Sequence, residues 1–195
     1  MKEILFFSKN KNKISEIYQL FKNSDFKILN LADFKNINSP KETGNTFEEN
    51  AKIKSYCGLI NFKKICFGDD SGICINAMDD QPGIFSKNFL NTEKDVKIVL
   101  RNIISFAKNK NNFKAFFQTS ICLSINENTH VYFDGKIYGK ISTELKGVEG
   151  FGYDPIFIPN GHKLTFAEMG IKKKNSISHR AIAIKKLKEY LLTSF

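Results

Sequence analysis

The chain is organised around one stretch, Ile65-Cys66-Phe67-Gly68-Asp69-Asp70-Ser71-Gly72-Ile73. Two adjacent carboxylates lie between an apolar run and an alternating run, with a glycine on each side. The pattern predicts a strand, an acidic turn and a second strand, because glycine adopts backbone angles that other residues avoid and lets a ligand approach closely. Two neighbouring carboxylates at a buried sheet edge are costly unless a cation or a proton compensates them. The stretch therefore indicates a chemical centre with a metal ion, although the same composition is typical of an ordinary turn.

Length and composition favour one domain that spans residues 1–195. With 195 residues, of which 42% are hydrophobic and 26% charged, the chain can bury a substantial core. A net charge of +10 favours an anionic partner, such as a nucleotide, a nucleic acid or a membrane surface. The four cysteines form no C-x-x-C pair, which argues against a zinc site or a disulfide framework. No apolar run is long enough for a signal peptide or a membrane span, so we expect a cytoplasmic protein without a membrane partner.

The order of the expected elements predicts an α/β protein with a mixed sheet. In the first half, strands are expected at residues 3–7, 26–31, 64–67 and 73–77, helices at 11–22 and 46–59, and a loop over 32–45. Capping-box patterns, Thr46-x-x-Glu49 and Thr92-x-x-Asp95, predict the starts of two helices. In the second half, β-rich runs at residues 113–125, 131–133, 136–141 and 156–158 suggest an antiparallel meander, and a last helix is expected over 178–192.

Two stretches of the first half carry groups suited to phosphate and metal. The junction Ser8-x-Asn10-x-x-Lys13 puts a hydroxyl, an amide and an ammonium group at a helix start, where N–H groups and the helix dipole favour an anion. The alternative is a helix cap followed by solvated lysines. Glu42 could join Asp69 and Asp70 at a magnesium ion, with a spare carboxylate left to activate a water for attack on phosphorus. The alternative for Glu42 is an exposed loop acid.

Two stretches of the second half also carry groups that could have a function, the first of them toward a base. Phe151-Gly152-Tyr153-Asp154 offers an aromatic face and a carboxylate that can accept from ring N–H groups, or it is a structural turn with core aromatics. Lys174-Asn175-Ser176-Ile177-Ser178-His179-Arg180 puts two basic residues in the first turn of the last helix. The helix dipole disfavours cations there by about 0.3–1 kcal/mol each, which indicates a function, while the alternative is a solvated basic face.

Taken in this order, the stretches resemble the inosine/xanthosine triphosphate pyrophosphatase family. The matching pieces are SKNKNKISEI, ETGNTFEENAKIK, GDDSGICINA, QPGIFS, GFGYDPIF and TFAEMGIKKKNSISHRAIAIKKL, which run from Ser8 to about Leu187. The resemblance implies magnesium-dependent hydrolysis of non-standard purine nucleoside triphosphates (ITP, dITP and XTP) to the monophosphate and pyrophosphate. It also implies an elongated mixed sheet flanked by helices, two lobes with a central nucleotide cleft, and a homodimer.

The resemblance assigns a role to each matching residue. Asp70 corresponds to the catalytic proton acceptor and, with Glu42, to the magnesium ligands, and Asp69 is a possible further ligand. The implied substrate contacts are Ser8, Lys9, Asn10, Lys11, Asn12 and Lys13 for the triphosphate, and Ser71, Phe151, Gly152, Tyr153, Asp154, Lys174, His179 and Arg180 for the rest of the nucleotide. Lys87 stands where the family often has arginine, and Ala181 where it usually has glycine. These departures bear on dimer geometry and fine specificity rather than on reaction type.

Two other hypotheses stay open at this point. A pyrophosphatase for other modified nucleotides, as in Maf-like proteins, would differ in its substrates. A basic nucleic-acid-binding protein would use the +10 charge and the interspersed aromatics. The chain carries no recognised nucleic-acid signature, however, and paired acids suit a phosphate backbone poorly without a metal. We therefore expect no stable nucleic-acid complex.

Overall fold

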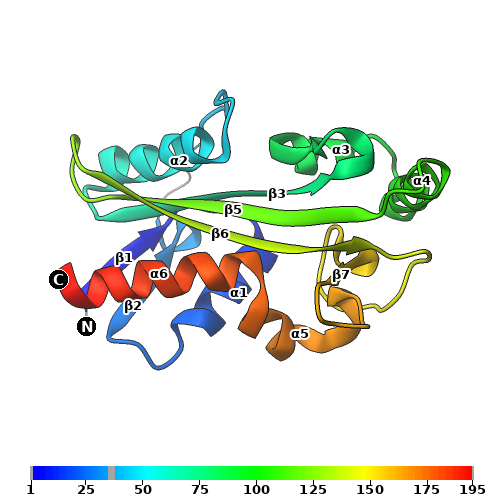
Figure 1. Ribbon diagram of the computed structural model, residues 1–195. Helices are drawn as coiled ribbons and strands as arrows, with labels where there is room; N and C mark the ends of the chain where they lie inside the picture. Colours follow the sequence, from blue (N-terminus) through cyan, green and yellow to red (C-terminus); the bar gives the residue numbers. More distant parts are fainter. Residues whose placement is uncertain (1, 35–37, 195) are drawn as a thin grey trace. The chain divides into compact units, whose positions relative to one another are not determined.

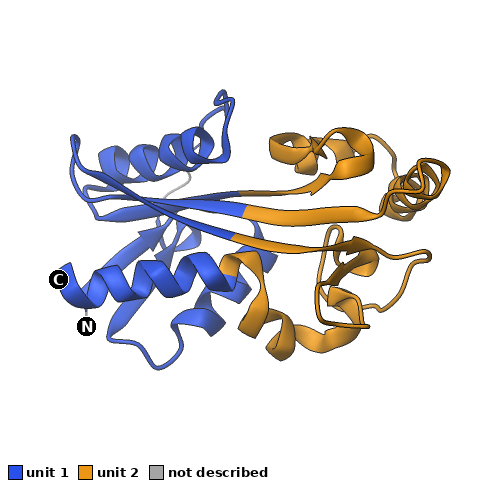
Figure 2. Ribbon diagram, in the orientation of Figure 1, with its two compact units in different colours: residues 1–70, 119–135, 181–195 blue, residues 71–118, 136–180 orange. Residues whose placement is uncertain are grey.

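The computed structural model describes residues 2–34 and 38–194, which fall into two compact units (Figures 1 and 2). Unit 1 comprises residues 1–70, 119–135 and 181–195, and unit 2 comprises residues 71–118 and 136–180. Three long strands contribute residues to both units, namely β3 (Cys66–Ile75), β5 (Lys114–Ser124) and β6 (His130–Ile141). The single domain expected over residues 1–195 stays a prediction.

The strands form a mixed sheet with the hydrogen-bonding order β2-β1-β3-β5-β6-β7, and β4 pairs with β3. The shorter strands are β1 (Lys2–Phe6), β2 (Phe26–Asn30), β4 (Gln81–Pro82) and β7 (Phe157–Pro159). β1 runs parallel to β2 and β3, whereas β4 and β7 pair antiparallel with β3 and β6. The predicted class, α/β with a mixed sheet, is confirmed.

Six α-helices accompany these strands in the described residues. They are α1 (Lys11–Phe21), α2 (Phe47–Phe62), α3 (Ser86–Leu90), α4 (Val96–Asn109), α5 (Phe166–Ile177) and α6 (His179–Ser194). Short 3-10 turns lie at Leu31–Asp33, Asn76–Met78, Gly83–Phe85 and Asp154–Ile156. Within residues 2–34 and 38–194, no helix is both long and apolar enough to cross a membrane.

In unit 1, helices cover both faces of the sheet (Figure 1). Alternate residues of β1 point to opposite faces, as expected for a strand. Ile4 and Phe6 pack with apolar residues of α1 and α6, whereas Leu5 and Phe7 pack with Leu59 of α2. The sheet of unit 1 therefore has α1 and α6 on one face and α2 on the other.

Unit 2 has its own apolar core. The buried face of α4, whose residues repeat at three and four as predicted, packs with Ile73 and Ile75 of β3. Phe117 of β5 lies at the centre of an aromatic group, with Phe157 and Phe166 at ring distances of 4.8 and 5.9 Å. This core fixes β3, β5 and α5 within the unit.

The acidic stretch is the main correction to the sequence-based prediction. β3 runs without interruption from Cys66 to Ile75, so Asp69 and Asp70 lie within a strand and not in a turn. The local composition favours a turn, but pairing with the neighbouring strands β1 and β5 keeps this stretch extended. The Thr119 hydroxyl on β5 also donates to the backbone carbonyl of Asp70 at 3.0 Å.

Three further predictions were wrong or incomplete. The runs at 131–133 and 136–141 form one strand, β6, because Gly135 is buried inside the sheet and does not end it. Helix α4 is capped by Asp95, whose Oδ1 accepts from the backbone N of Lys97 at 2.9 Å, and not by Thr92. Helix α5 was not predicted, although Thr165 and Glu168 form its capping box. Of the loop expected over 32–45, residues 35–37 lie outside the described residues.

Candidate functional site

Helix α2 holds the carboxylate of Asp70. The helix lies close to β3 because residue 68 is glycine, where a Cβ would come within 2.7 Å of Lys54 Cβ and 2.8 Å of the Ala51 carbonyl oxygen. Asn50 and Lys54 lie one helical turn apart on the face that meets Asp70. Lys54 Nζ is 2.9 Å from Asp70 Oδ1, and Asn50 Nδ2 donates to Asp70 Oδ2 at 3.3 Å. Both carboxylate oxygens of Asp70 therefore have a partner on α2.

Glu42 joins this group through the same lysine. Lys54 Nζ lies 3.2 Å from Glu42 Oε2. The loop that carries Glu42 is tied to α2, since the backbone N of Gly44 donates to Asn50 Oδ1 at 2.9 Å. Thr46 caps α2 as predicted by accepting from the backbone N of Glu49 at 3.1 Å. Two carboxylates from different parts of the chain thus converge on one ammonium group.

Asp69 has different partners from Asp70. Its Oδ2 lies 2.9 Å from Nζ of Lys13, which belongs to α1, whereas Asp70 contacts α2. The separation follows from strand geometry, because successive side chains point to opposite faces. Asp69 therefore does not share the contacts of Glu42 and Asp70, and its role as a possible further metal ligand stays a prediction.

The predicted junction between the first strand and the first helix is formed. Asn10 is the N-cap of α1, and its Oδ1 accepts from the backbone N of Asn12 and of Lys13 at 3.0 and 3.2 Å. Ser8 Oγ accepts from the backbone N of Asn10 at 3.2 Å. The side-chain oxygens of Ser8 and Asn10 thus organise the turn, and the exposed side chains are those of Lys9, Asn10, Lys11 and Asn12.

The acid–lysine cluster, defined as Glu42, Asp69, Asp70, Lys13 and Lys54, contains three carboxylates and two ammonium groups. Burial raises the pKa of Asp70 above its ordinary value, although the charges of Lys54 and Lys13 act in the opposite direction. Burial alone would lower the pKa of Lys54, but the charges of Asp70, Asp69 and Glu42 outweigh it and raise that pKa. The surplus of negative charge favours a further cation.

Two carboxylates of this cluster fit a magnesium ion. In the part of the chain that the structure describes, no three side chains of His, Cys, Asp or Glu gather into a metal-binding group. Glu42 and Asp70, however, each direct an oxygen to the same ammonium group. Magnesium is commonly held by one or two carboxylates, with water and phosphate oxygens at the other positions.

Unit 2 contains a second, charge-balanced cluster of Phe151, Asp154 and Lys174. Asp154 Oδ2 lies 2.6 Å from Lys174 Nζ, and both side chains are only 3% exposed. Asp154 Oδ2 also accepts from the backbone N of Phe151 at 2.7 Å, and Lys174 Nζ lies 4.5 Å from the Phe151 ring centre. A Cβ at Gly150, where φ is +78°, would lie 2.1 Å from Asp154 Oδ2, so the loop closes only with glycine there.

The neighbouring residues of the predicted base loop differ in role. Gly152 also has a positive φ, of +65°, and shapes the loop. Tyr153 is buried in the core of unit 2, and its hydroxyl donates to the backbone carbonyl of Ser86 at 2.7 Å. Burial raises the pKa of Tyr153 well above its ordinary value. Phe151 is only half-buried, so it is the aromatic residue of this loop with a face left to offer.

His179 and Arg180 open helix α6, as predicted. The His179 ring stacks on Phe117 with a centroid distance of 4.7 Å and an interplanar angle of 7°. Arg180 is 2% exposed, and its Nη2 donates to Ser71 Oγ at 2.9 Å. The pair is therefore buried and positioned, which excludes the solvated basic face as its description. Ser71 and Arg180, both expected at the site, contact each other.

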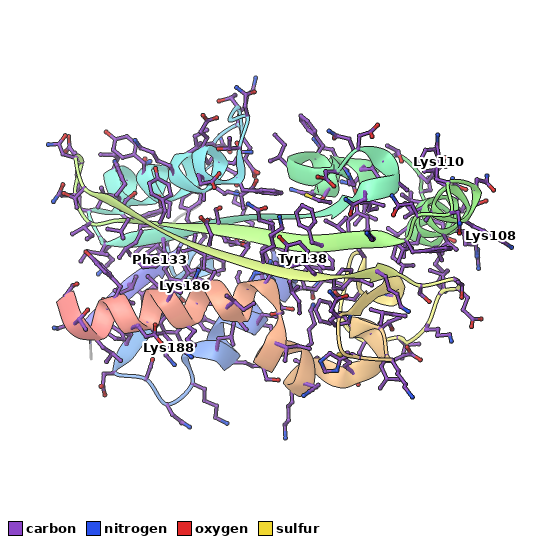
Figure 3. The ribbon with its side chains drawn as sticks, in the orientation of Figure 1. Lys108, Lys110, Phe133, Tyr138, Lys186 and Lys188 are labelled. Atoms are coloured by element: carbon purple, nitrogen blue, oxygen red, sulfur yellow. The ribbon has the colours of Figure 1, made fainter. Side chains whose placement is uncertain are left out.

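The remaining positive charge is spread over separate elements. Figure 3 shows Lys108 and Lys110 at the end of α4, and Lys186 and Lys188 on α6. Lys186 Nζ donates to the backbone carbonyl of Asp134 at 2.7 Å, and Lys188 Nζ to that of Leu20 at 3.2 Å. Lys186 and Lys188 therefore make contacts within unit 1, whereas Lys108 and Lys110 belong to unit 2.

Sequence reasoning missed Asn50 and Lys54. Both lie on the helix predicted from residue 46, and their spacing of four puts them on one helical face. The sequence pattern does not predict that the helix face with Asn50 and Lys54 meets Asp70, because Asp70 is expected in a turn. Had the stretch been recognised as a strand, Gly68 would have been the signal for a close helix.

The fold and the two clusters define an α/β protein with a mixed sheet, a buried acid–lysine cluster and a helix start suited to anions. The chain belongs to the Ham1 family, whose family model matches residues 4–190. It is 38% identical to the dITP/XTP pyrophosphatase of Halalkalibacterium halodurans over 195 residues, which cover 98% of this chain and 100% of that protein. It is 36% identical to the dITP/XTP pyrophosphatase of Christiangramia forsetii over 189 residues, with coverage of 97% and 98%.

Solved structures agree with this assignment. A HAM1 protein from Coxiella burnetii superposes with a TM-score of 0.89 at 32% identity, and the match covers 100% of both chains. The Ham1 protein of Staphylococcus aureus gives a TM-score of 0.87 at 31% identity, again over 100% of both chains. The family resemblance and the α/β fold expected from the sequence are therefore confirmed.

Proposed function

We propose that this chain hydrolyses non-standard purine nucleoside triphosphates, namely ITP, dITP and XTP, to the nucleoside monophosphate and pyrophosphate. The observation that carries the proposal is the convergence of Glu42 and Asp70 on Lys54 in a chain of the Ham1 family. The names of the relatives support the substrate class, because they are called dITP/XTP pyrophosphatases. Such a reaction would remove deaminated purines from the nucleotide pool.

The acid–lysine cluster would bind and hydrolyse the triphosphate. The N–H groups and the positive dipole end of α1 suit phosphate oxygens, and the exposed Lys9 and Lys11 attract them by charge. Ser8 and Asn12, in the same turn, would also contact the triphosphate. Asp70 would accept the proton of the attacking water as a general base.

Magnesium is the cofactor that we propose, held by Glu42 and Asp70. When bound, the ion would offset the charge of the triphosphate and of the leaving pyrophosphate. Lys13 would add a second positive charge for the pyrophosphate, although in the structure it is paired with Asp69. Asn50 would keep the Asp70 carboxylate in its orientation through the bond to Oδ2.

The residues of unit 2 would recognise the purine. The Phe151 face can stack on a base, Asp154 can accept from ring N–H groups, and Lys174 fixes the position of Asp154. Arg180 and His179 would donate toward the 6-keto group of hypoxanthine or xanthine. Adenine has an amino group there, which would leave a buried donor without an acceptor, at a cost of about 1–3 kcal/mol.

A substrate panel tests the proposal. Pyrophosphate release would be measured from ITP, dITP, XTP, ATP and GTP, each with and without magnesium. We expect release from the first three, little from ATP, and none without magnesium. Equal rates on ATP and ITP would contradict the specificity. No release from ITP, dITP or XTP would favour the alternative of a Maf-like enzyme that acts on other modified nucleotides.

A cytoplasmic location and a homodimer complete the proposal, both from the family resemblance. The four cysteines carry free thiols, which fits a reducing compartment. Light scattering on the purified chain would give its mass in solution, and a monomer at all concentrations would contradict the homodimer. A titration with single- and double-stranded DNA at low salt would check that no stable nucleic-acid complex forms.

A further inference from the structure

We propose that Lys54 is a built-in counter-cation that competes with the divalent metal, so that the metal binds tightly only together with the triphosphate. The inference rests on the proposed function, because it takes Glu42 and Asp70 as metal ligands. It adds an order to the binding, in which metal and nucleotide each strengthen the other's affinity.

The geometry gives Lys54 the position of a bridging cation. Its Nζ lies 3.2 Å from Glu42 Oε2 and 2.9 Å from Asp70 Oδ1, and the lysine side chain is only 12% exposed. A metal ion that binds the same two oxygens must replace this ammonium group or bear its repulsion. Lys54 therefore weakens metal binding wherever it keeps these contacts.

The charges of the cluster point the same way. With Lys13 and Lys54 present, three carboxylates face two ammonium groups, and removal of the Lys54 charge doubles the negative surplus. The attraction for a divalent ion should then increase. Asp70 would stay in place, since Asn50 still donates to its Oδ2 and the Thr119 hydroxyl to its backbone carbonyl.

A triphosphate supplies the partner that lets Lys54 leave. Lysine carries a compact charge on a flexible four-carbon chain, so its ammonium group can shift to a phosphate oxygen. Once it has shifted, Glu42 and Asp70 are available to the metal. Linkage requires the reverse as well, because an effect of nucleotide on metal affinity equals the effect of metal on nucleotide affinity.

Metal binding would be measured directly, by electron paramagnetic resonance of Mn²⁺, without and with a non-hydrolysable α,β-methylene analogue of ITP. The variants are Lys54→Met, which removes the charge at nearly constant length, and Lys54→Arg, which keeps it. Lys52→Met is the matched control, because Lys52 is an exposed lysine on the same helix. Glu42→Gln tests whether the Mn²⁺ signal comes from the proposed site. Circular dichroism would confirm that each variant is folded.

We expect Lys54→Met to bind Mn²⁺ alone about tenfold more tightly than the original chain, and to lose most of the enhancement by the analogue. Lys54→Arg and Lys52→Met should keep weak binding alone and strong enhancement. Unchanged or weaker Mn²⁺ binding by Lys54→Met, with binding still lost in Glu42→Gln, would overturn the inference and leave the proposed site intact. Mn²⁺ binding that does not depend on Glu42 would overturn both. If Lys54→Met does not fold, a strong enhancement in the original chain that Lys54→Arg abolishes would also contradict the inference.

Discussion

The two clusters differ in charge balance and in exposure. In unit 1, the acid–lysine cluster has one carboxylate more than it has ammonium groups, and Glu42 is 43% exposed. In unit 2, Asp154 and Lys174 form a balanced pair, and each side chain is 3% exposed. Glu42 of the first cluster is open to solvent, whereas the ion pair of the second cluster is buried beside the Phe151 ring. This difference fits the proposal that unit 1 carries out the chemistry and unit 2 recognises the purine ring.

This contrast also separates function from stability. A buried ion pair adds little net stability by itself. Removal of one partner is strongly destabilising, because it leaves the other charge buried without compensation. In the acid–lysine cluster, burial raises the pKa of Asp70, so keeping this carboxylate charged is costly for folding. Variants of the acid–lysine cluster should therefore affect turnover more than stability. Variants of the buried pair in unit 2 should affect both.

The largest effect is expected for Asp70→Asn. The amide cannot accept a proton from water, so turnover of ITP should fall at least about a hundredfold, the usual contribution of a general base. Binding of ITP without magnesium should persist, because no direct phosphate contact is assigned to Asp70. Steady-state kinetics and equilibrium binding of ITP would measure the two effects, with Asp25→Asn, an exposed acid of unit 1, as the control. Turnover near that of the control would place the base elsewhere.

Next comes Lys174→Met in unit 2, which leaves the buried Asp154 carboxylate without its ammonium partner. We expect a loss of about 3–5 kcal/mol in the free energy of unfolding, measured with urea. Lys172→Met, at an exposed position of the same helix, is the control. The double variant with Asp154→Asn should be less destabilised than the sum of the two single variants. Additive effects would mean that the pair does not act as a unit.

Gly68→Ala should have an intermediate effect in unit 1. Its Cβ would press on Lys54 Cβ and on the Ala51 carbonyl, so α2 would move away from Asp70 at a cost of about 1–3 kcal/mol. Turnover should fall as well, because Asn50 and Lys54 move with the helix. Gly161→Ala is a useful comparison, because its φ of +79° makes alanine strained while the space around it is open. Gly161→Ala should lose stability but keep its turnover. Full turnover in Gly68→Ala would contradict the role of α2 in positioning Asn50 and Lys54.

These positions show how much the sequence could predict. The helices at residues 11–22 and 46–59 were found because apolar spacing and caps are local signals, and Asn10 and Thr46 do cap α1 and α2. The strand through Asp69 and Asp70 was not found, because its cause is pairing with β1 and β5, which are distant in sequence. The motifs identify Asp69 and Asp70 as candidates. Their separate partners, Lys13 and Lys54, could not be predicted, because they depend on the two side chains pointing to opposite faces of a strand. Lys54 is not predicted as a site residue, because a lysine on a surface helix normally faces water.

The smallest effect is a pH dependence that arises from His130 in unit 1, outside the acid–lysine cluster. Its Nδ1 lies 2.9 Å from Ser124 Oγ, and burial, followed by the charge of Lys52, lowers its pKa below the ordinary 6.5. Below pH 6.5 the unfolded chain therefore binds the proton more readily than the folded protein, and stability falls as the pH falls. His130→Gln should remove this part of the fall, measured by urea unfolding at pH 7.5 and 5.5. An unchanged pH dependence in His130→Gln would show that His130 titrates equally in both states.

In the proposed reaction, the acid–lysine cluster of unit 1 releases pyrophosphate from a non-standard purine triphosphate. Phosphorus NMR of the products tests it most directly, with ITP, magnesium and either the original chain or Asp70→Asn. We expect IMP and pyrophosphate in equal amounts from the original chain, without inorganic phosphate, and almost no product from Asp70→Asn. Formation of IDP and inorganic phosphate, or the same products at the same rate from Asp70→Asn, would contradict it.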